Sequence, residues 1–151
     1  MKILMLDTIT YGDDISLDKF KTLGEVITYR TSTQEEALQR IKETQPDVVV
    51  TNKVVITKEL FEASPNIKMV AETATGYNNI DLEAARKKGI TVCNIPAYSS
   101  ERVAHTAVMM ILNLSSTMQV QMKMLANGNH DNFTKNLQVP HVEVNGKTLG
   151  I

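Results

Sequence analysis

Short apolar runs alternate with amphipathic stretches over the first hundred residues of the chain. Each run is continuously apolar, which is typical of strands whose two faces are both covered by helices. Strands that are separated by helical segments predict βαβ units and a parallel sheet. The predicted strands are Ile3–Asp7, Val26–Tyr29, Val48–Thr51, Met69–Glu72 and Thr91–Asn94.

Helix start signals occupy the segments between these runs. Ser16, Thr33, Thr57 and Asp81 stand where the helices are expected to begin, because their side chains can accept hydrogen bonds from free N–H groups there. Thr33 and Glu36 have the spacing of a capping box. Five strands with right-handed crossovers predict an α/β, flavodoxin-like, doubly wound sheet in the order 2-1-3-4-5.

The last third of the chain has a different pattern. Residues 100–127 contain no strand pattern and predict one long helix, which is apolar on nearly every face between 103 and 114. Such a helix is normally buried on all sides, so we expect another domain or a second copy of the chain to cover it. The sequence thus divides into a flavodoxin-like domain (1–99), an interdomain or dimerisation helix (100–127) and a polar linker (128–151).

Composition and charge exclude several classes of protein. The 151 residues have a net charge of -1, which gives no electrostatic reason to bind nucleic acid or an anionic membrane. The single cysteine, Cys93, excludes an internal disulfide, and its apolar neighbours predict a buried thiol. No apolar run is long enough to span a bilayer, and no Cys/His cluster has metal-ligand spacing. We therefore expect a cytoplasmic protein without a metal.

The loop that follows the fourth predicted strand is the strongest candidate for a binding site. Ligands of doubly wound sheets bind at the carboxyl ends of the strands, and Thr75 and Gly76 stand at such an end. Gly76 could adopt torsions closed to other residues and turn successive N–H groups toward a carboxylate. The alternative is a plain turn, in which Gly76 serves geometry alone.

Three further residues stand at neighbouring strand ends. Asn52 and Lys53 follow the third strand, where a lysine could attract an anion, although an ordinary solvated charge is the alternative. Tyr98 follows the fifth strand, and its hydroxyl could face the same mouth. Its alternative role is that of a packed aromatic residue with a wet tip.

Four segments, in this order along the chain, resemble the D-isomer-specific 2-hydroxyacid dehydrogenases. The loops after the fourth and fifth predicted strands are most similar to the glycerate dehydrogenase (hydroxypyruvate reductase) branch. The closing segment resembles the stretch that leads into the family's dinucleotide-binding glycines. The four segments are Ala74–Leu82, Gly89–Ser99, Val103-Ala104 and Gly146–Ile151.

The resemblance implies an oxidoreductase that interconverts a 2-keto acid and a D-2-hydroxy acid with NAD or NADP. It places the N–H groups of Thr75 and Gly76 on the substrate carboxylate, and Asn52, Lys53 and Tyr98 around the mouth. It also places Val103 and Ala107 on the nicotinamide side. Family members often carry threonine where Ala107 stands, so this sequence departs from the pattern there.

The resemblance also implies that the catalytic arginine and histidine and the Rossmann glycines lie outside this sequence. We therefore expect an amino-terminal fragment of a longer parent, in which residues 128–151 lead into the first strand of a missing Rossmann domain. We expect the fragment to bind no cofactor, to contain no catalytic residue and to be inactive alone.

Two other classes of protein are the alternatives. A signalling receiver domain needs an acidic pair after the first strand, an aspartate after the third and a lysine after the fifth. Here the first strand gives only Asp7 followed by Thr8, the third ends at Thr51 and the fifth at Asn94, which excludes a receiver. A catalytically dead interaction module that forms a homodimer through the 103–114 helix remains the alternative, because that helix would otherwise expose a large apolar patch.

Overall fold

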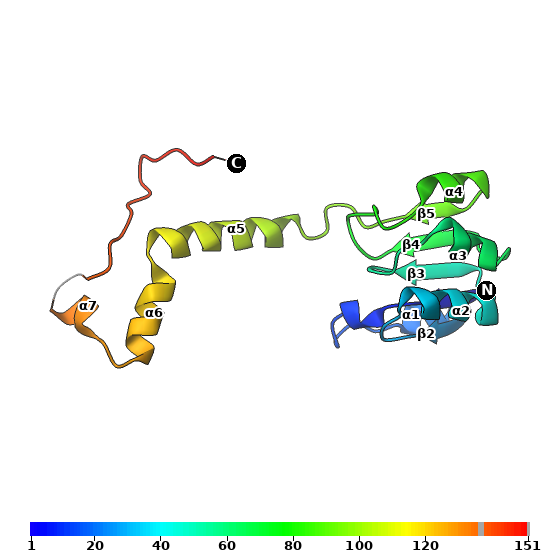
Figure 1. The fold of residues 1–151 in the computed structure, drawn as a ribbon, viewed down its shortest axis with the longest axis horizontal. Helices are drawn as coiled ribbons and strands as arrows, with labels where there is room; N and C mark the ends of the chain where they lie inside the picture. Colours follow the sequence, from blue (N-terminus) through cyan, green and yellow to red (C-terminus); the bar gives the residue numbers. More distant parts are fainter. Residues whose placement is uncertain (136–137, 151) are drawn as a thin grey trace. The chain divides into compact units, whose positions relative to one another are not determined.

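The structure is a computed structural model that describes residues 1–135 and 138–150. The chain divides into two compact units, residues 1–98 and 99–151 (Figure 1). No helix in the described ranges is both long and apolar enough to cross a membrane.

The first unit contains a five-stranded sheet that confirms the predicted topology. All strand pairs are parallel, and the order is β2-β1-β3-β4-β5. Every predicted strand is present, and two of the five have the predicted bounds. The strands are β1 (Lys2–Met5), β2 (Glu25–Thr28), β3 (Val48–Thr51), β4 (Met69–Glu72) and β5 (Thr91–Cys93).

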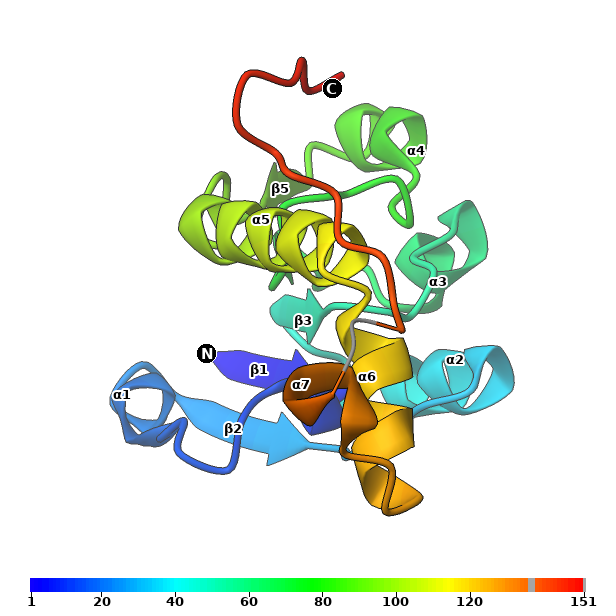
Figure 2. The same ribbon diagram turned by 90° about the vertical axis from the view of Figure 1, so that its left-hand side faces the viewer.

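Helices cover both faces of this sheet. Figure 2 shows α2, α3 and α4 on one side of the strands and α1 on the other. The short helix η1 (Thr8–Thr10) directly follows β1 and forms part of the carboxyl edge of the sheet. The α-helices of this unit are α1 (Asp18–Lys21), α2 (Gln34–Thr44), α3 (Lys58–Ala63) and α4 (Leu82–Lys87).

The predicted helix caps are confirmed at two of the four positions. Thr33 and Glu36 form the complete capping box of α2, and the Asp81 side chain accepts from the N–H group of Ala84. Thr57 occupies the N-cap of α3 but accepts no capping hydrogen bond. Ser16 lies one residue before the N-cap of α1, so its predicted position is wrong by one.

Two clusters of buried side chains form the core, one on each face of the sheet. The larger one joins the sheet to α2, α3 and α4, and it includes Leu4, Leu6, Ile41, Val49, Leu60, Phe61 and Val70. The smaller one contains Ile3, Met5 and Val50. Cys93 is exposed, so the predicted burial of its thiol is wrong. The reason is that Val92 packs against the larger cluster and the adjacent Cys93 faces the other side of the sheet, where the smaller cluster does not reach β5.

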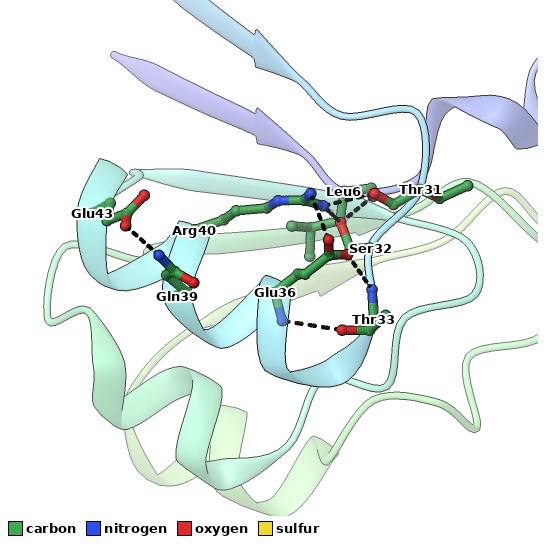
Figure 3. A network of polar contacts seen from close by, with 8 residues as sticks. All are labelled: Leu6, Thr31, Ser32, Thr33, Glu36, Gln39, Arg40 and Glu43. Carbon is green, nitrogen blue, oxygen red and sulfur yellow. Dashed lines mark hydrogen bonds and ion pairs between the residues drawn. The ribbon is translucent and has the colours of Figure 1, made fainter.

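Arg40 fixes the loop between β2 and α2 beside the carboxyl end of β1 (Figure 3). Its guanidinium donates to the carbonyl oxygen of Thr31 at 2.6 Å and to Oγ of Ser32. Its Cζ lies 3.9 Å from the ring centroid of Tyr29, within the range of a cation–π contact. Ser32 in turn donates to the carbonyl oxygen of Leu6, which ties this loop to the end of β1.

The second unit contains α5 (Ser100–Ser115), α6 (Met118–Ala126) and α7 (Asp131–Thr134). The single helix expected over 100–127 is not confirmed, because the chain breaks between α5 and α6. Thr117 has a φ of 50°, a left-handed conformation that cannot continue a helix. Its Oγ1 donates to the carbonyl oxygen of Pro140 at 2.6 Å, which anchors the break.

No residue of α5 is buried within the chain itself, and Leu114 is 77% exposed. The expectation that another domain or a second copy of the chain covers this helix stays a prediction. The segment near Val142 returns to the end of α5, where Val142 donates its N–H to the carbonyl oxygen of Ser115 at 2.8 Å. Residues 138–150 form no strand, and the predicted strand start at Ile151 lies outside the described residues.

Candidate functional site

The carboxyl ends of the strands in the first unit meet at one edge, where two of the following loops are joined to each other. Ile56, after β3, forms an isolated bridge with Ile80, after β4. Ile56 donates its N–H to the carbonyl oxygen of Asn79 at 2.8 Å and accepts from the N–H of Asp81 at 2.9 Å. The two loops therefore form one connected rim.

Exposed main-chain N–H groups lie in the loop after β4. Thr75, Gly76 and Tyr77 are exposed, and their N–H groups donate to nothing within the part of the chain that the structure describes. The loop is anchored from behind, because Thr75 Oγ1 donates to the carbonyl oxygen of Ile95 at 3.1 Å and Asn94 Nδ2 donates to that of Thr75 at 2.8 Å. Free donors on an anchored loop are a ready site for an anion.

The predicted role of Gly76 torsions is wrong. Its φ lies outside the left-handed region, so the loop needs no glycine-only conformation at this position. A Cβ atom built on Gly76 would lie 3.2 Å from Oδ1 of Asn78. Glycine at this position therefore gives room for the close approach of the Asn78 side chain.

Asn52 and Lys53 lie in the same rim but face different surroundings. The Asn52 side chain is directed back into the fold, where Nδ2 donates to the carbonyl oxygen of Thr73 at 3.4 Å. Lys53 is exposed, and no carboxylate among the described residues pairs with its ammonium. Its charge is therefore available to an anionic ligand at the rim.

A cavity of about 170 Å³ opens beside Lys53 at the switch point between β1 and β3. A doubly wound sheet leaves a crevice where its strand order reverses, and this is where such folds bind ligands. The cavity is lined by Asp7, Ile9, Thr10, Thr31, Ser32, Lys53 and Val54.

Asp7 organises the rim, a role that the sequence reasoning passed over. The residue is 4% exposed, and its carboxylate accepts from Thr51 Oγ1 at 2.9 Å and from the N–H groups of Asn52, Lys53 and Val54 at 2.7 to 3.2 Å. This one side chain thus shapes the backbone of the loop after β3. The available signal was an acid at the carboxyl end of the first apolar run.

Glu72 and Asn79 form a second buried polar contact that the sequence reasoning missed. Asn79 Nδ2 donates to Glu72 Oε2 at 2.9 Å and to the carbonyl oxygen of Val54 at 3.2 Å. Burial has the largest effect and raises the pKa of the Glu72 carboxyl, and the hydrogen bond from Asn79 lowers it; the charges of Asp7 and Lys53 have smaller effects, Asp7 raising the pKa and Lys53 lowering it. An acid at the end of a continuously apolar strand was the only sequence signal.

Residues 3–144 match the sequence profile of the family "D-isomer specific 2-hydroxyacid dehydrogenase, catalytic domain". The chain belongs to this family. Its members are oxidoreductases, as the resemblance at Ala74–Leu82 and Gly89–Ser99 predicts.

Individual relatives agree with the family, and a solved structure shares the fold. The chain is 35% identical over 157 residues to a hydroxypyruvate reductase of Blautia hydrogenotrophica, covering 100% of this chain and 48% of that protein. It is 31% identical over 151 residues to a D-3-phosphoglycerate dehydrogenase of Methanocaldococcus jannaschii, covering 100% of this chain and 27% of that protein. A D-lactate dehydrogenase of Aquifex aeolicus, solved with NAD and lactic acid, has a TM-score of 0.76 at 23% identity, covering 95% of this chain and 41% of that one. The chain spans half or less of the length of these proteins.

The predicted roles of Tyr98, Val103 and Ala107 stay predictions. Tyr98 is 64% exposed, and its hydroxyl makes no hydrogen bond to the described residues. Val103 and Ala107 belong to the second unit, where they line a groove of about 340 Å³ on α5. The groove is otherwise lined by Arg102, Thr106 and Met110.

The described residues do not fit a complete nicotinamide dinucleotide. Binding of its pyrophosphate in this class of enzyme needs a glycine-rich turn that opens a helix. No helix in ranges 1–135 and 138–150 begins with such a turn, since the N-caps are polar, leucine or histidine residues. The same ranges hold no group of His, Cys, Asp and Glu that could bind a metal.

Proposed function

We propose that this chain is the substrate-side half of an NAD(P)-dependent D-2-hydroxyacid dehydrogenase. The observation that carries the proposal is the row of free N–H groups at Thr75, Gly76 and Tyr77, which stands where a doubly wound sheet binds its ligand. These donors match the carboxylate that every 2-keto acid and 2-hydroxy acid shares.

The rest of the rim supports the same ligand. The Lys53 ammonium adds a positive charge that attracts an organic acid, and the 170 Å³ cavity beside it has room for a short side group. Because a relative 35% identical to the chain is a hydroxypyruvate reductase, we propose hydroxypyruvate and D-glycerate as the substrate pair. Tyr98 is proposed as a further contact at the mouth.

We infer that the nucleotide and the acid–base groups come from a partner domain of a longer parent. The described residues offer no pyrophosphate site, and the relatives are two or more times longer than this chain. Structurally similar proteins were solved with NAD and with NADPH, which supports either nucleotide in the parent. In that parent Val103 and Ala107 would lie on the nicotinamide side, and the protein would be cytoplasmic.

Nuclear magnetic resonance of the 151-residue chain tests the proposed carboxylate site. Titration with hydroxypyruvate is expected to shift the amide resonances of Thr75 and Gly76 at millimolar concentration. Dihydroxyacetone, which keeps the ketone and the hydroxymethyl group but has a second hydroxymethyl group in place of the carboxylate, is the matched control and is expected to leave them in place. Equal shifts with both compounds, or shifts with neither, would contradict the proposal.

A turnover assay tests the inferred division of labour. We expect the purified 151-residue chain to leave NADH and NADPH absorbance unchanged in the presence of hydroxypyruvate, because hydride transfer requires the nucleotide to be held against the substrate. Oxidation of either nucleotide above the rate without protein would refute the inference.

We also propose that α5 pairs with a second copy of the chain. Its exposed apolar residues form a patch of the kind that marks interaction surfaces. The patch contains Val103, Val108, Met109, Met110, Leu112 and Leu114. Light scattering of the native chain should give the mass of a dimer. Leu114→Glu should lower the measured mass to that of the monomer, 16.8 kDa. A native chain that is monomeric at high concentration would exclude this pairing.

A further inference from the structure

Two buried oxygen atoms at the rim lack hydrogen-bond partners within the described chain. They are Oε1 of Glu72 and Oδ1 of Asn52. Glu72 is 1% exposed, so water does not replace the missing partner freely. Buried polar atoms in native proteins are nearly always paired, and each unpaired one needs a physical explanation. Both atoms are acceptors when Glu72 is ionised, so in that state neither can satisfy the other.

The two residues stand beside each other in the sheet and share a neighbour. Thr51 of β3 lies opposite Glu72 of β4, and Asn52 is the next residue after Thr51. Asn52 Nδ2 reaches the carbonyl oxygen of Thr73, the residue after Glu72. Asn79 Nδ2 lies 2.9 Å from Glu72 Oε2 and 3.5 Å from the carbonyl oxygen of Asn52. One amide group therefore contacts both residues.

We propose that Glu72 is a positioning residue held as a neutral carboxylic acid, which donates its proton to Asn52 Oδ1 and accepts from Asn79 Nδ2. A single proton then satisfies both orphaned oxygens. Through Asn52 the acid holds the loop after β3, and through Asn79 it holds the loop that contains Gly76. The hydrogen-bond network does not depend on the proposed function. Its effect on a bound organic acid, through the position of the loop that contains Gly76, rests on that function.

The charges around Glu72 favour the neutral acid. Asp7, from the end of β1, places a negative charge on the same edge, and Tyr11 lies close enough to sense both carboxyl groups. Among the described residues, the positive group that lowers the Glu72 pKa is Lys53, which is solvent-exposed. Burial is the largest influence and raises the Glu72 pKa, because a low dielectric disfavours the charged form.

The pH dependence of stability follows from the raised pKa of the Glu72 carboxyl. A carboxyl whose pKa is higher in the folded than in the unfolded state stabilises the fold fully below its ordinary value, about 4.3. That stabilisation is lost as the pH rises through the raised pKa of the folded state. Ionised Glu72 has no proton for Asn52, and its charge faces Asp7, so the two rim loops lose their common anchor.

A carboxyl-carbon titration of the native 151-residue chain tests the proposal directly. We expect the Glu72 resonance to titrate above about 4.3, the ordinary value for glutamate. The side-chain amide resonances of Asn79 and the backbone amide of Gly76 should move with the same midpoint. A midpoint at or below the ordinary value, or an Asn79 side chain that does not respond, would overturn the assignment.

Glu72→Gln separates positioning from general stability. Glutamine keeps one donor for Asn52 and one acceptor for Asn79, and it does not ionise. The urea midpoint of this variant relative to the native chain should rise with pH above about 4.3 and level off once the pH passes the raised pKa of the folded state, whereas exposed Glu59→Gln should show no such trend. A difference between this variant and the native chain that does not change with pH would overturn the proposal. Failure of hydroxypyruvate to shift the Gly76 amide, with the Glu72 titration as expected, would overturn the proposed function alone.

Discussion

Replacement of Asp7 by alanine should destabilise the first unit more than any other single change at the rim. The carboxylate accepts from three consecutive N–H groups, those of Asn52, Lys53 and Val54. Among the described residues only the N–H of Val54 has a second acceptor, Thr51 Oγ1 at 3.2 Å. A buried donor left without an acceptor costs about 1–3 kcal/mol, although water that enters the space of the lost side chain recovers part of this. We expect a loss of about 3–5 kcal/mol from Asp7→Ala.

Asp7→Asn is the informative partner of that variant. Oδ2 accepts from all four donors, whereas Oδ1 accepts only a second contact, at 3.0 Å, from the N–H of Asn52. An asparagine with its oxygen at the Oδ2 position therefore keeps the geometry and loses the charge. Charge-assisted hydrogen bonds are roughly twice as strong as neutral ones, so we expect a loss of about 1–2 kcal/mol.

Urea unfolding followed by far-ultraviolet circular dichroism measures both losses at pH 7. Exposed Asp13→Asn is the matched control and should lie within about 0.5 kcal/mol of the native chain. The order of stability is expected to be native and Asp13→Asn, then Asp7→Asn, then Asp7→Ala. An Asp7→Ala variant within 1 kcal/mol of the native chain would refute the reasoning, because the three N–H groups would then not depend on this carboxylate.

Two further predictions concern charge and ionisation at the same edge. Lys53→Ala should weaken hydroxypyruvate binding by roughly 3- to 10-fold in the amide titration, and this difference should shrink at high salt. The control Lys58→Ala should leave the affinity unchanged. A loss of affinity that does not depend on salt would argue against an electrostatic role of Lys53. Burial, the largest influence, raises the pKa of the Tyr11 hydroxyl, with Asp7 and Glu72 raising it further and a hydrogen bond to Thr73 lowering it. Tyr11→Phe should therefore remove the component of the tyrosinate absorbance that appears at the highest pH, and loss of a component that titrates near pH 10 would contradict this.

Local signals explain why much of the fold could be predicted. The Thr33–Glu36 capping box forms within four residues, and Asp81 caps the helix that it precedes, so both could be inferred without knowledge of the rest of the chain. Each of the five apolar runs is likewise recognised from a few consecutive residues, and the parallel topology follows from the alternation of these runs with helices. Of the site, the loop at Thr75 and Gly76 could be located because it follows a strand, although Gly76 serves the approach of Asn78 and not a special torsion.

The remaining features depend on residues that are distant in the sequence. Thr51 Oγ1 and Asp7 form a hydrogen bond across 44 positions, and only the parallel pairing of β1 with β3 makes them neighbours. Cys93 is exposed because the smaller core cluster does not reach β5, and the helix over 100–127 breaks where Thr117 contacts Pro140.

The amino-acid sequence alone thus determined the strands, their order, the main caps and the family. Each of these rests on residue preferences that act over a few positions or on a motif that is read in order. Only the tertiary structure decided which polar groups are buried together at the rim. The physical reason is that the burial of Asp7 and Glu72, and the partners that make it tolerable, are supplied by three separate strands and the loops that follow them.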